Sequence, residues 1–330
     1  MTDQTTASTM RTVRFHEYGK PADVLHLEDA PIPEPRAGTI RIAVHSCGLA
    51  PADWALCGGL FAGDLPRGVG IDVSGTVDAI GDGVTDVSLG DRVLGSAAWR
   101  TSPSAGASDF TIMDRWALVP AGLDLTNAAA LPMAVDTAYL HLTLLGLEPG
   151  KTILINGAGT TIGFAAVQIA LVRGMRVVAT AGQTHAQQLR ALGADVTAYG
   201  PGLVDRVRAI TGQPVDLVLD AAPVGGALPE LIELAGGRPQ NVLSSGGSIP
   251  EAAELGARDS FHEVRPEGLD ALPEFAQLAA DGRFSIPIAG VFPLEDWRTA
   301  LEISEGGQAR GKLLLRVGGA GTADATDATD

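Results

Sequence analysis

A glycine-rich stretch near the middle of the chain has the residue types and spacing of an anion-binding turn. An apolar run over 153–155 leads into Gly157-x-Gly159-x-x-x-Gly163, one residue longer than the pattern G-x-G-x-x-G. Glycines let backbone N–H groups approach a pyrophosphate, and a following helix N-terminus adds positive dipole. The stretch therefore predicts dinucleotide binding, although a glycine pattern alone is weak evidence. The residues expected at the cofactor are Gly157, Ala158, Gly159, Thr160, Thr161, Ile162 and Gly163.

Strand and helix patterns alternate after this turn. We expect strands over 176–180, 195–199, 215–220 and 241–244, and helices over 185–192, 203–211 and 228–235. Such alternation predicts a parallel sheet with helices on both faces, and ligands bind at the carboxyl ends of its strands. Several loops converging on one edge are stronger evidence than the glycines alone. The further cofactor residues expected at these ends are Thr180, Gln183, Tyr199, Ala221, Ala222, Ser244, Ser245 and Gly246.

The chain before the turn has the texture of an antiparallel β-domain. Residues 39–46 alternate apolar and polar, and further strands are expected over 11–15, 24–28, 73–80 and 91–94. An alanine-rich helical region over 126–145 leads into the turn. Strand patterns return at 288–292 and 312–317, on either side of a helix over 294–305, so we expect the C-terminal segment to complete the first domain.

The predicted fold class is therefore α/β with two domains. A distorted β-barrel is expected over 11–125 and 287–317, and a doubly wound parallel-sheet domain over 126–286. Residues 1–10 and 318–330 lack apolar periodicity and are expected to be disordered tails.

Composition narrows the function classes. A net charge of −16 disfavours nucleic-acid binding, because Lys and Arg must neutralise phosphates. The only cysteines, Cys47 and Cys57, cannot build a disulfide framework or a four-cysteine zinc site. We expect no membrane span, and the polar first ten residues lack the apolar core of a signal peptide. A cytoplasmic enzyme is the expectation.

Several ordered motifs together resemble one family. They include IDVSGTVDAIGDGVTDVSLGDRVLG (71–95), NGAGTTIG (156–163), ALGADVTAY (191–199) and VFPLEDWRTALEISEGGQARGKLLLRV (291–317). These resemble the zinc-independent quinone oxidoreductases of the medium-chain dehydrogenase/reductase superfamily. The resemblance implies a GroES-like catalytic domain, a Rossmann domain, NADPH between them, and a homodimer or homotetramer.

Departures from the superfamily patterns bear on the chemistry. In the zinc alcohol dehydrogenases of the superfamily, a Cys, a His and a second Cys bind the catalytic metal. The residues at the matching positions of this chain are Ala50, Ile71 and Met133, which cannot bind zinc in that way, so no metal is expected. Zinc-independent relatives carry Asn-Pro-x-Asp, and the sequence here is Ala-Pro-Ala-Asp, ending at Asp53. Asp53 is a weak catalytic candidate, and turn capping is favoured for it. Phe61 replaces a tyrosine and cannot donate a proton. The expected substrate pocket comprises Ala50, Trp54, Phe61, Met133 and Asp136.

The expected cofactor is NADP(H). NAD enzymes place an acid after the second strand, and residues 181–185 contain none. Thr180 and Gln183 could donate hydrogen bonds to a 2′-phosphate, and Tyr199 matches a tyrosine that contacts it in relatives. Relatives often have a lysine near the position of His185, which makes His185 a candidate for contact with the 2′-phosphate. The alternative is that His185 is an exposed residue of a helix. The resemblance also places Thr137 at the nicotinamide and Lys312 beside the cofactor, with a plain surface lysine as the competitor.

The chain is therefore interpreted as an NADPH-dependent reductase of quinones or activated C=C bonds. Without a metal or a tyrosine acid, the best acceptor is one whose reduced anion is stable by itself. Two alternatives stay open. One is a tailoring enoyl reductase acting on a polycyclic or carrier-bound intermediate, and the other is a non-catalytic NADPH-binding protein or redox sensor.

Overall fold

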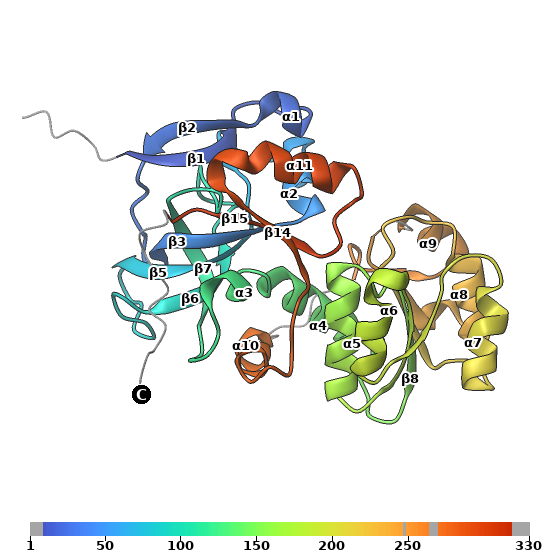
Figure 1. Cartoon of the computed structure of the whole chain (residues 1–330). Coiled ribbons are helices and arrows are strands. Elements are labelled where there is room, and N and C mark those ends of the chain that lie inside the picture. The colour runs from blue at the N-terminus through green and yellow to red at the C-terminus, as the bar shows by residue number, and fades with distance from the viewer. Residues whose placement is uncertain (1–8, 247–248, 264–269, 319–330) are drawn as a thin grey trace, which may run out of the picture. The chain divides into compact units, whose positions relative to one another are not determined.

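A computed structural model of the protein describes residues 9–246, 249–263 and 270–318. Contacts divide the chain into two compact units, Met1–Met133 with Leu272–Asp330 and Ala134–Ala271. Figure 1 labels their elements. The predicted tails lie mostly outside the described residues. The first strand already begins at Thr9, with Met10 only 3% exposed, so the N-terminal tail is shorter than the predicted 1–10.

Unit 1 is built on a six-stranded sheet of order β14-β15-β3-β5-β6-β7. β3 pairs with both β5 and β7, which closes the sheet into the predicted distorted barrel. β15 pairs antiparallel with β3, so the C-terminal segment completes this unit as expected. Only the β14–β15 pair is parallel in this sheet. The strands are β3 (Ile40–Leu49), β5 (Asp72–Ile80), β6 (Arg92–Ala97), β7 (Phe110–Leu118), β14 (Ile288–Pro293) and β15 (Lys312–Arg316).

A smaller sheet and short helices cover the barrel. The three-stranded sheet has the order β2-β1-β4, and β1 pairs antiparallel with β2 as the sequence predicts. Helix α11 packs on β14 and β15 and also contacts α1 and α2. These elements are β1 (Thr9–Phe15), β2 (His26–Pro31), β4 (Arg67–Gly68), α1 (Pro21–Val24), α2 (Pro51–Cys57), α3 (Leu125–Ala128), α10 (Leu272–Ala280), η2 (Leu294–Asp296) and α11 (Trp297–Glu305).

Unit 2 is a parallel six-stranded sheet of order β10-β9-β8-β11-β12-β13. The chain runs outward from β8 through β9 and β10, then returns to the other side of β8 at β11. The order of the strands therefore reverses between β8 and β11, which is where parallel α/β sheets bind ligands. The strands are β8 (Thr152–Asn156), β9 (Arg176–Thr180), β10 (Asp195–Thr197), β11 (Leu217–Asp220), β12 (Val242–Ser244) and β13 (Arg258–Asp259).

Helices cover both faces of this sheet. Figure 1 shows α5 and α6 on one side of β8 and α7, α8 and α9 on the other. The second group buries a cluster that includes Leu154, Val178 and Val218 of the sheet. This confirms the doubly wound prediction. The helices are α4 (Pro132–Leu145), α5 (Thr161–Val172), α6 (Gln183–Ala191), α7 (Leu203–Thr211), α8 (Leu228–Leu234), η1 (Pro239–Asn241) and α9 (Ile249–Leu255).

The unit boundaries differ from the predicted 125/126 and 286/287. The first falls after Met133 because α3 packs on β3, β5 and β6 of the barrel. The second falls before Leu272 because α10 packs on β7, and Phe275 of α10 meets Phe284 with ring centroids 5.1 Å apart. The long helical region predicted over 126–145 is broken between α3 and α4.

One helical run is long and apolar enough to span a membrane, judged by its length and composition alone. Leu125–Leu145 has a mean hydropathy of 1.3, and 67% of its most apolar window is buried within the protein. Buried core helices pass the same test, so the run carries no argument for a membrane.

Candidate functional site

The turn after β8 is shaped by two glycines that the protein itself requires. Gly157 has φ of +76°, and a Cβ there would lie 2.6 Å from Ala222 N. A Cβ on Gly163 would lie 2.3 Å from Gly157 O. Any side chain at either position would collide with backbone. These two glycines therefore fix the path of the turn into α5.

Gly159 is different, because nothing in the unit requires it to be glycine. Its φ is not in the left-handed region, and a Cβ would make only an ordinary contact, 3.5 Å from His185 Cδ2. A small residue that the surrounding packing does not demand leaves room for a ligand to approach the backbone.

Three backbone amides of the turn have no hydrogen-bond acceptor within the described ranges. They belong to Gly159, Thr161 and Ile162, all half-buried at the N-terminus of α5. By contrast, Ala158 N donates to Thr180 O and Thr160 N to Gly157 O. Adjacent free donors at a helix N-terminus suit an anion such as a pyrophosphate. The residues present thus fit a dinucleotide.

Thr160, one of the residues expected at the cofactor, caps α5. Its Oγ1 accepts from Gly163 N at 3.0 Å and lies 2.9 Å from Gly157 O, to which it can donate. The N-cap residue has φ of −77°, as a β-branched side chain requires. The hydroxyl is therefore used inside the turn.

Thr180 also uses its hydroxyl within the protein. It is fully buried, and its Oγ1 donates to Asn156 Oδ1 at 2.6 Å and accepts from Gly157 N at 3.0 Å. Asn156 Nδ2 donates in turn to Asp220 Oδ1 at 2.8 Å. This buried network ties together the ends of β8, β9 and β11 beneath the turn. The hydroxyl proton of Thr180 is thus used by Asn156, and a contact of Thr180 with a 2′-phosphate stays a prediction.

The carboxyl end of β9 presents neutral, exposed side chains. Gln183 is the first residue of α6, and both Gln183 and Thr184 are exposed. Tyr199 is 66% exposed and lies beside Gly182. His185 is only 8% exposed and packs edge-on against Phe164, so the expected alternative of an exposed helix position is wrong.

Strand register brings the other predicted cofactor residues to the same edge. Asp220 pairs with both Asn156 and Ser244, so β8, β11 and β12 end level. Ala221 N donates to Asn156 O, and Ser245 N donates to Asp220 O. Ser244 Oγ is buried with no hydrogen-bond partner in the described part of the chain. The residues placed here are Ala221, Ala222, Ser244, Ser245 and Gly246, while Asp136 and Thr137 lie half-buried on α4.

Asp53 in unit 1 is structural rather than catalytic. It is fully buried, and its carboxylate accepts from Gly70 N, Ile71 N and Ala50 N at 2.7, 2.9 and 2.8 Å. Burial raises the pKa of Asp53 to about 6, against the influence of Lys312 and the backbone donors. The carboxylate thus caps the start of α2 and links it to the segment between β4 and β5.

Lys312 lies in the interior of unit 1 and not on its surface. Its side chain is 3% exposed, and Nζ lies 2.5 Å from Oδ2 of the fully buried Asp72. Asp72 Oδ1 accepts from Met133 N at 2.9 Å. The ammonium is occupied by this carboxylate. The alternative of a plain surface lysine is wrong, while a contact of Lys312 with the cofactor stays a prediction.

The predicted substrate-pocket residues of unit 1 separate into core and surface. Trp54 is 6% exposed, and its Nε1 donates to Ser304 Oγ at 2.9 Å, so it packs in the core of unit 1. Ala50 is the N-cap residue of α2, and Met133 packs against the same core. Phe61 is 45% exposed on the loop after α2. Cys47 is fully buried, in agreement with a packing role.

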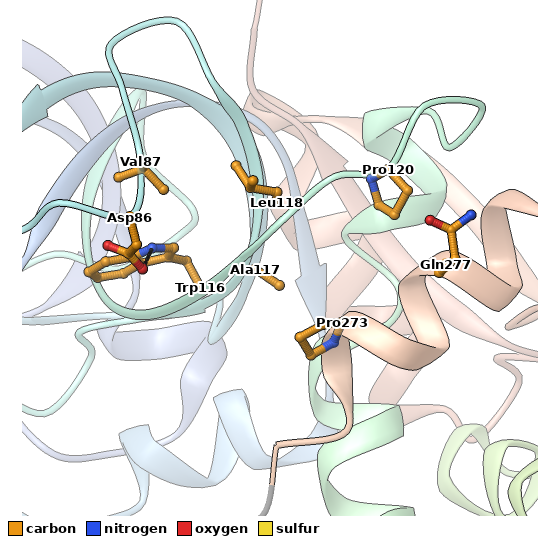
Figure 2. A pocket seen from close by; sticks show the side chains of 8 residues that line it. All are labelled: Asp86, Val87, Trp116, Ala117, Leu118, Pro120, Pro273 and Gln277. Atoms are coloured by element: carbon orange, nitrogen blue, oxygen red, sulfur yellow. Dashed lines mark hydrogen bonds between the residues drawn. The ribbon is translucent and has the colours of Figure 1, made fainter.

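A pocket of about 430 Å³ lies elsewhere in unit 1, beside β7 and α10. Figure 2 shows its apolar walls, with Trp116 Nε1 hydrogen-bonded to Asp86 at 3.2 Å. None of the predicted substrate residues lines it. The lining residues are Asp86, Val87, Trp116, Ala117, Leu118, Pro120, Pro273 and Gln277.

Comparison with known proteins identifies the family. Residues 36–123 match the alcohol dehydrogenase GroES-like domain, and residues 192–315 match the family described as zinc-binding dehydrogenase. The chain is 33% identical to a trans-enoyl reductase of Aspergillus japonicus over 74% of its own length and 86% of the relative's. This chain belongs to the medium-chain dehydrogenase/reductase superfamily.

Within this superfamily the chain is of the quinone oxidoreductase type. It is 28% identical to human quinone oxidoreductase, covering 93% of this chain and 97% of that protein. The solved quinone oxidoreductase of Coxiella burnetii matches with a TM-score of 0.79 and 29% identity, over 94% of this chain and 100% of that one. The chain is therefore an oxidoreductase of a superfamily that uses a nicotinamide cofactor, with a GroES-like domain and a Rossmann-like domain.

The superfamily's metal-ligand positions hold no metal ligands here. Ala50, Ile71 and Met133 lack the thiolates and imidazole that bind zinc in the zinc alcohol dehydrogenases. Among the residues that the structure describes, no group of three His, Cys, Asp or Glu side chains could hold an ion. Instead, Asp72, which follows Ile71, holds Lys312 and the Met133 amide.

Sequence reasoning missed two residues that organise the site. Asp72 is a charged residue within an apolar strand, and such a residue needs a buried partner. Asn156 ends the apolar run of β8 and links Thr180 to Asp220. In both cases the available signal was a polar residue next to apolar residues of a buried strand, where no position faces solvent.

Proposed function

We propose that this chain is an NADPH-dependent reductase that transfers hydride to a quinone or an activated C=C bond without a metal ion. The bound nicotinamide supplies the hydride. Gly159, Thr161 and Ile162 would hold the pyrophosphate through their free amides, with Gly157 and Gly163 shaping the turn. Ala221, Ala222, Ser245 and Gly246 would line the same edge, and Thr137 would lie at the nicotinamide.

The observation that carries the choice of NADPH is the neutral end of β9. An acid at this point would accept from the ribose 2′-hydroxyl of NADH and repel a 2′-phosphate. Gln183 and Thr184 are exposed there, Tyr199 stands beside them, and no acid lies between 181 and 185. Steady-state Michaelis constants test the choice. A value for NADPH well below that for NADH is expected, and equal values contradict it.

The acceptor follows from the side chains near the superfamily's catalytic position. Asp53 is tied to three amides, Lys312 to Asp72, and Phe61 has no acidic proton. General acid catalysis typically contributes about 10²–10⁴-fold. Quinones and enones tolerate its loss best, because their reduced anions delocalise charge onto oxygen. Hydride from NADPH and a proton from solvent then give the hydroquinone, or the saturated carbonyl compound.

A panel of acceptors tests this chemistry. NADPH oxidation is measured with quinones, conjugated enones, simple ketones and, in the reverse direction, alcohols with NADP⁺. Turnover with quinones or enones is expected. Activity confined to simple ketones or alcohols overturns the proposal.

The second candidate is an enoyl reductase acting on a carrier-bound biosynthetic intermediate. The similarity to the trans-enoyl reductase of Aspergillus japonicus favours it. An enoyl thioester offered beside a free quinone distinguishes the two, because a dedicated enoyl reductase prefers the thioester. A homodimer is part of the proposal, and light scattering in solution tests it.

A further inference from the structure

The loop after α2 carries a bulky residue in the left-handed conformation. Phe61 has φ of 53°, and no other non-glycine residue of the described ranges has a positive φ. Such a conformation is unfavourable for a residue with a bulky side chain and persists only where surrounding contacts impose it. Here Arg67, 4% exposed, donates from Nη1 to Phe61 O at 2.7 Å. The Tyr18 hydroxyl fixes the loop again by bonding both N and O of Gly63 at 2.7 Å.

The fixed loop presents an aromatic surface. The exposed Phe61 ring lies 5.9 Å from the ring of Trp99, with the two planes inclined at 53°. The guanidinium of Arg100 lies over both rings, 4.4 Å from the Phe61 centroid and 4.1 Å from that of Trp99. Phe61, Trp99 and Arg100 together form what we call the aromatic–arginine cluster.

The two arginines of this region are not neutralised by the protein. Neither Arg67 nor Arg100 has an ion pair with a carboxylate anywhere in the described residues, although the chain carries a net charge of −16. Arg100 also donates no hydrogen bond to the described part of the chain. A cation without a counter-ion beside the exposed Phe61 ring and the half-buried Trp99 ring favours an anionic, planar ligand.

Stacking leaves the donors of Arg100 available. The guanidinium carbon of Arg100 contacts the two rings, and none of its N–H groups is used in a hydrogen bond to the described residues, so its planar set of donors is available to a ligand. A carboxylate or sulfonate can accept two parallel hydrogen bonds from these donors. Because stacking restricts the side chain beforehand, less rotamer entropy is lost on binding.

We propose that the aromatic–arginine cluster is a specificity site for acceptors that carry an ionised oxyacid substituent on a planar ring. Phe61 and Trp99 stack against the ring, and Arg100 binds the anionic group. The inference rests on the proposed function, because the acceptor is taken to be a quinone reduced by this chain.

A matched pair of quinones tests the site: a naphthoquinone bearing a sulfonate group and its uncharged parent. NADPH oxidation is measured for the wild type, Arg100→Met and Arg100→Lys. Arg298→Met is the control, because Arg298 is also an exposed arginine stacked on a tryptophan, 4.3 Å from the Trp297 centroid. Thermal unfolding checks that each variant is folded.

Arg100→Met is expected to lower kcat/KM for the sulfonated quinone about tenfold more than for the parent, as loss of a charge-assisted hydrogen bond predicts. Arg100→Lys should restore part of this selectivity, and Arg298→Met should leave kcat/KM for both quinones unchanged. Equal losses on both quinones, or no loss, would overturn the proposal.

Binding without turnover separates this inference from the proposed function. Tryptophan fluorescence is titrated with the sulfonated quinone, and Trp99→Leu identifies the signal of the cluster. If the wild type binds this quinone more tightly than Arg100→Met but reduces neither compound, the site stands and the proposed function fails. If the wild type reduces both and Arg100→Met keeps the same ratio, the function stands and the site fails.

Discussion

Lys312 and Asp72 form a buried ion pair in unit 1, and Asp72 follows Ile71 directly in the sequence. Nζ lies 2.5 Å from Oδ2, and the same carboxylate accepts from the Met133 amide. The pair therefore joins β15, β5 and the first turn of α4. Burial raises the pKa of Asp72, and Lys312 opposes that rise.

Breaking this pair from one side should be costly. Lys312→Met leaves a buried carboxylate without its cation, and we expect a loss of about 3–5 kcal/mol of unfolding free energy. Adding Asp72→Asn should recover part of that loss, because the neutral amide keeps an acceptor for Met133 N. Urea denaturation measures both, with exposed Lys20→Met as the control. A double variant less stable than Lys312→Met would contradict the unpaired Asp72 carboxylate as the cause of the loss.

Asp53 should make stability depend on pH. Burial raises its pKa from 3.8 to about 6, so the folded state holds the proton more tightly than the unfolded state does. The wild type should therefore lose stability relative to Asp53→Asn as the pH rises from about 4 to about 6, by on the order of 3 kcal/mol. Urea unfolding of both proteins across this range measures the difference. A relative gain for the wild type would mean that the three amide bonds outweigh burial.

Elements with a regular apolar periodicity were predicted from the sequence, whereas elements with an interrupted or very short pattern were missed. β9 and α7 lie at the residues expected from their apolar periodicity. β7 was missed because Asp114 and Arg115 interrupt the alternation in FTIMDRWAL. β13, only two residues long, exists through its pairing with β12 and has no local signal.

The candidate site was predictable as a location but not in its side-chain roles. Glycine spacing located the turn. The hydroxyls of Thr160 and Thr180 looked available in sequence, yet both are used by neighbouring backbone and side-chain groups. Lys312 and its partner Asp72 lie 240 residues apart in the chain, so no local pattern shows that the two side chains are buried together. Roles that depend on long-range partners cannot be read from local patterns.

The two glycines at the start of the turn should respond differently to alanine. Gly157→Ala places a Cβ against Ala222 at a left-handed φ and should destabilise the protein by about 1–3 kcal/mol or more. Gly159→Ala meets only an ordinary contact, so stability should persist while the Kd for NADPH rises about tenfold. Thermal unfolding and fluorescence titration measure the two effects. Unchanged affinity in Gly159→Ala would place the pyrophosphate elsewhere.

An acid at the end of β9 should change the cofactor preference. Gln183 is exposed at the start of α6, so Gln183→Asp should fold normally. The carboxylate should repel a 2′-phosphate and raise the Michaelis constant for NADPH about tenfold while favouring NADH. Gln187→Asp, exposed on the same helix, is the matched control. A variant that keeps the NADPH preference would show that the 2′-phosphate binds away from Gln183.

The most direct test of the central claim is an anaerobic single turnover. Equimolar NADPH and a quinone are mixed with excess protein, with and without a metal chelator, and the nicotinamide absorbance is followed. We expect complete oxidation of NADPH, formation of an equal amount of hydroquinone, and the same rate in the presence of the chelator. Bound NADPH that stays reduced with every quinone and enone, or oxidation that the chelator abolishes, would contradict a metal-independent reductase.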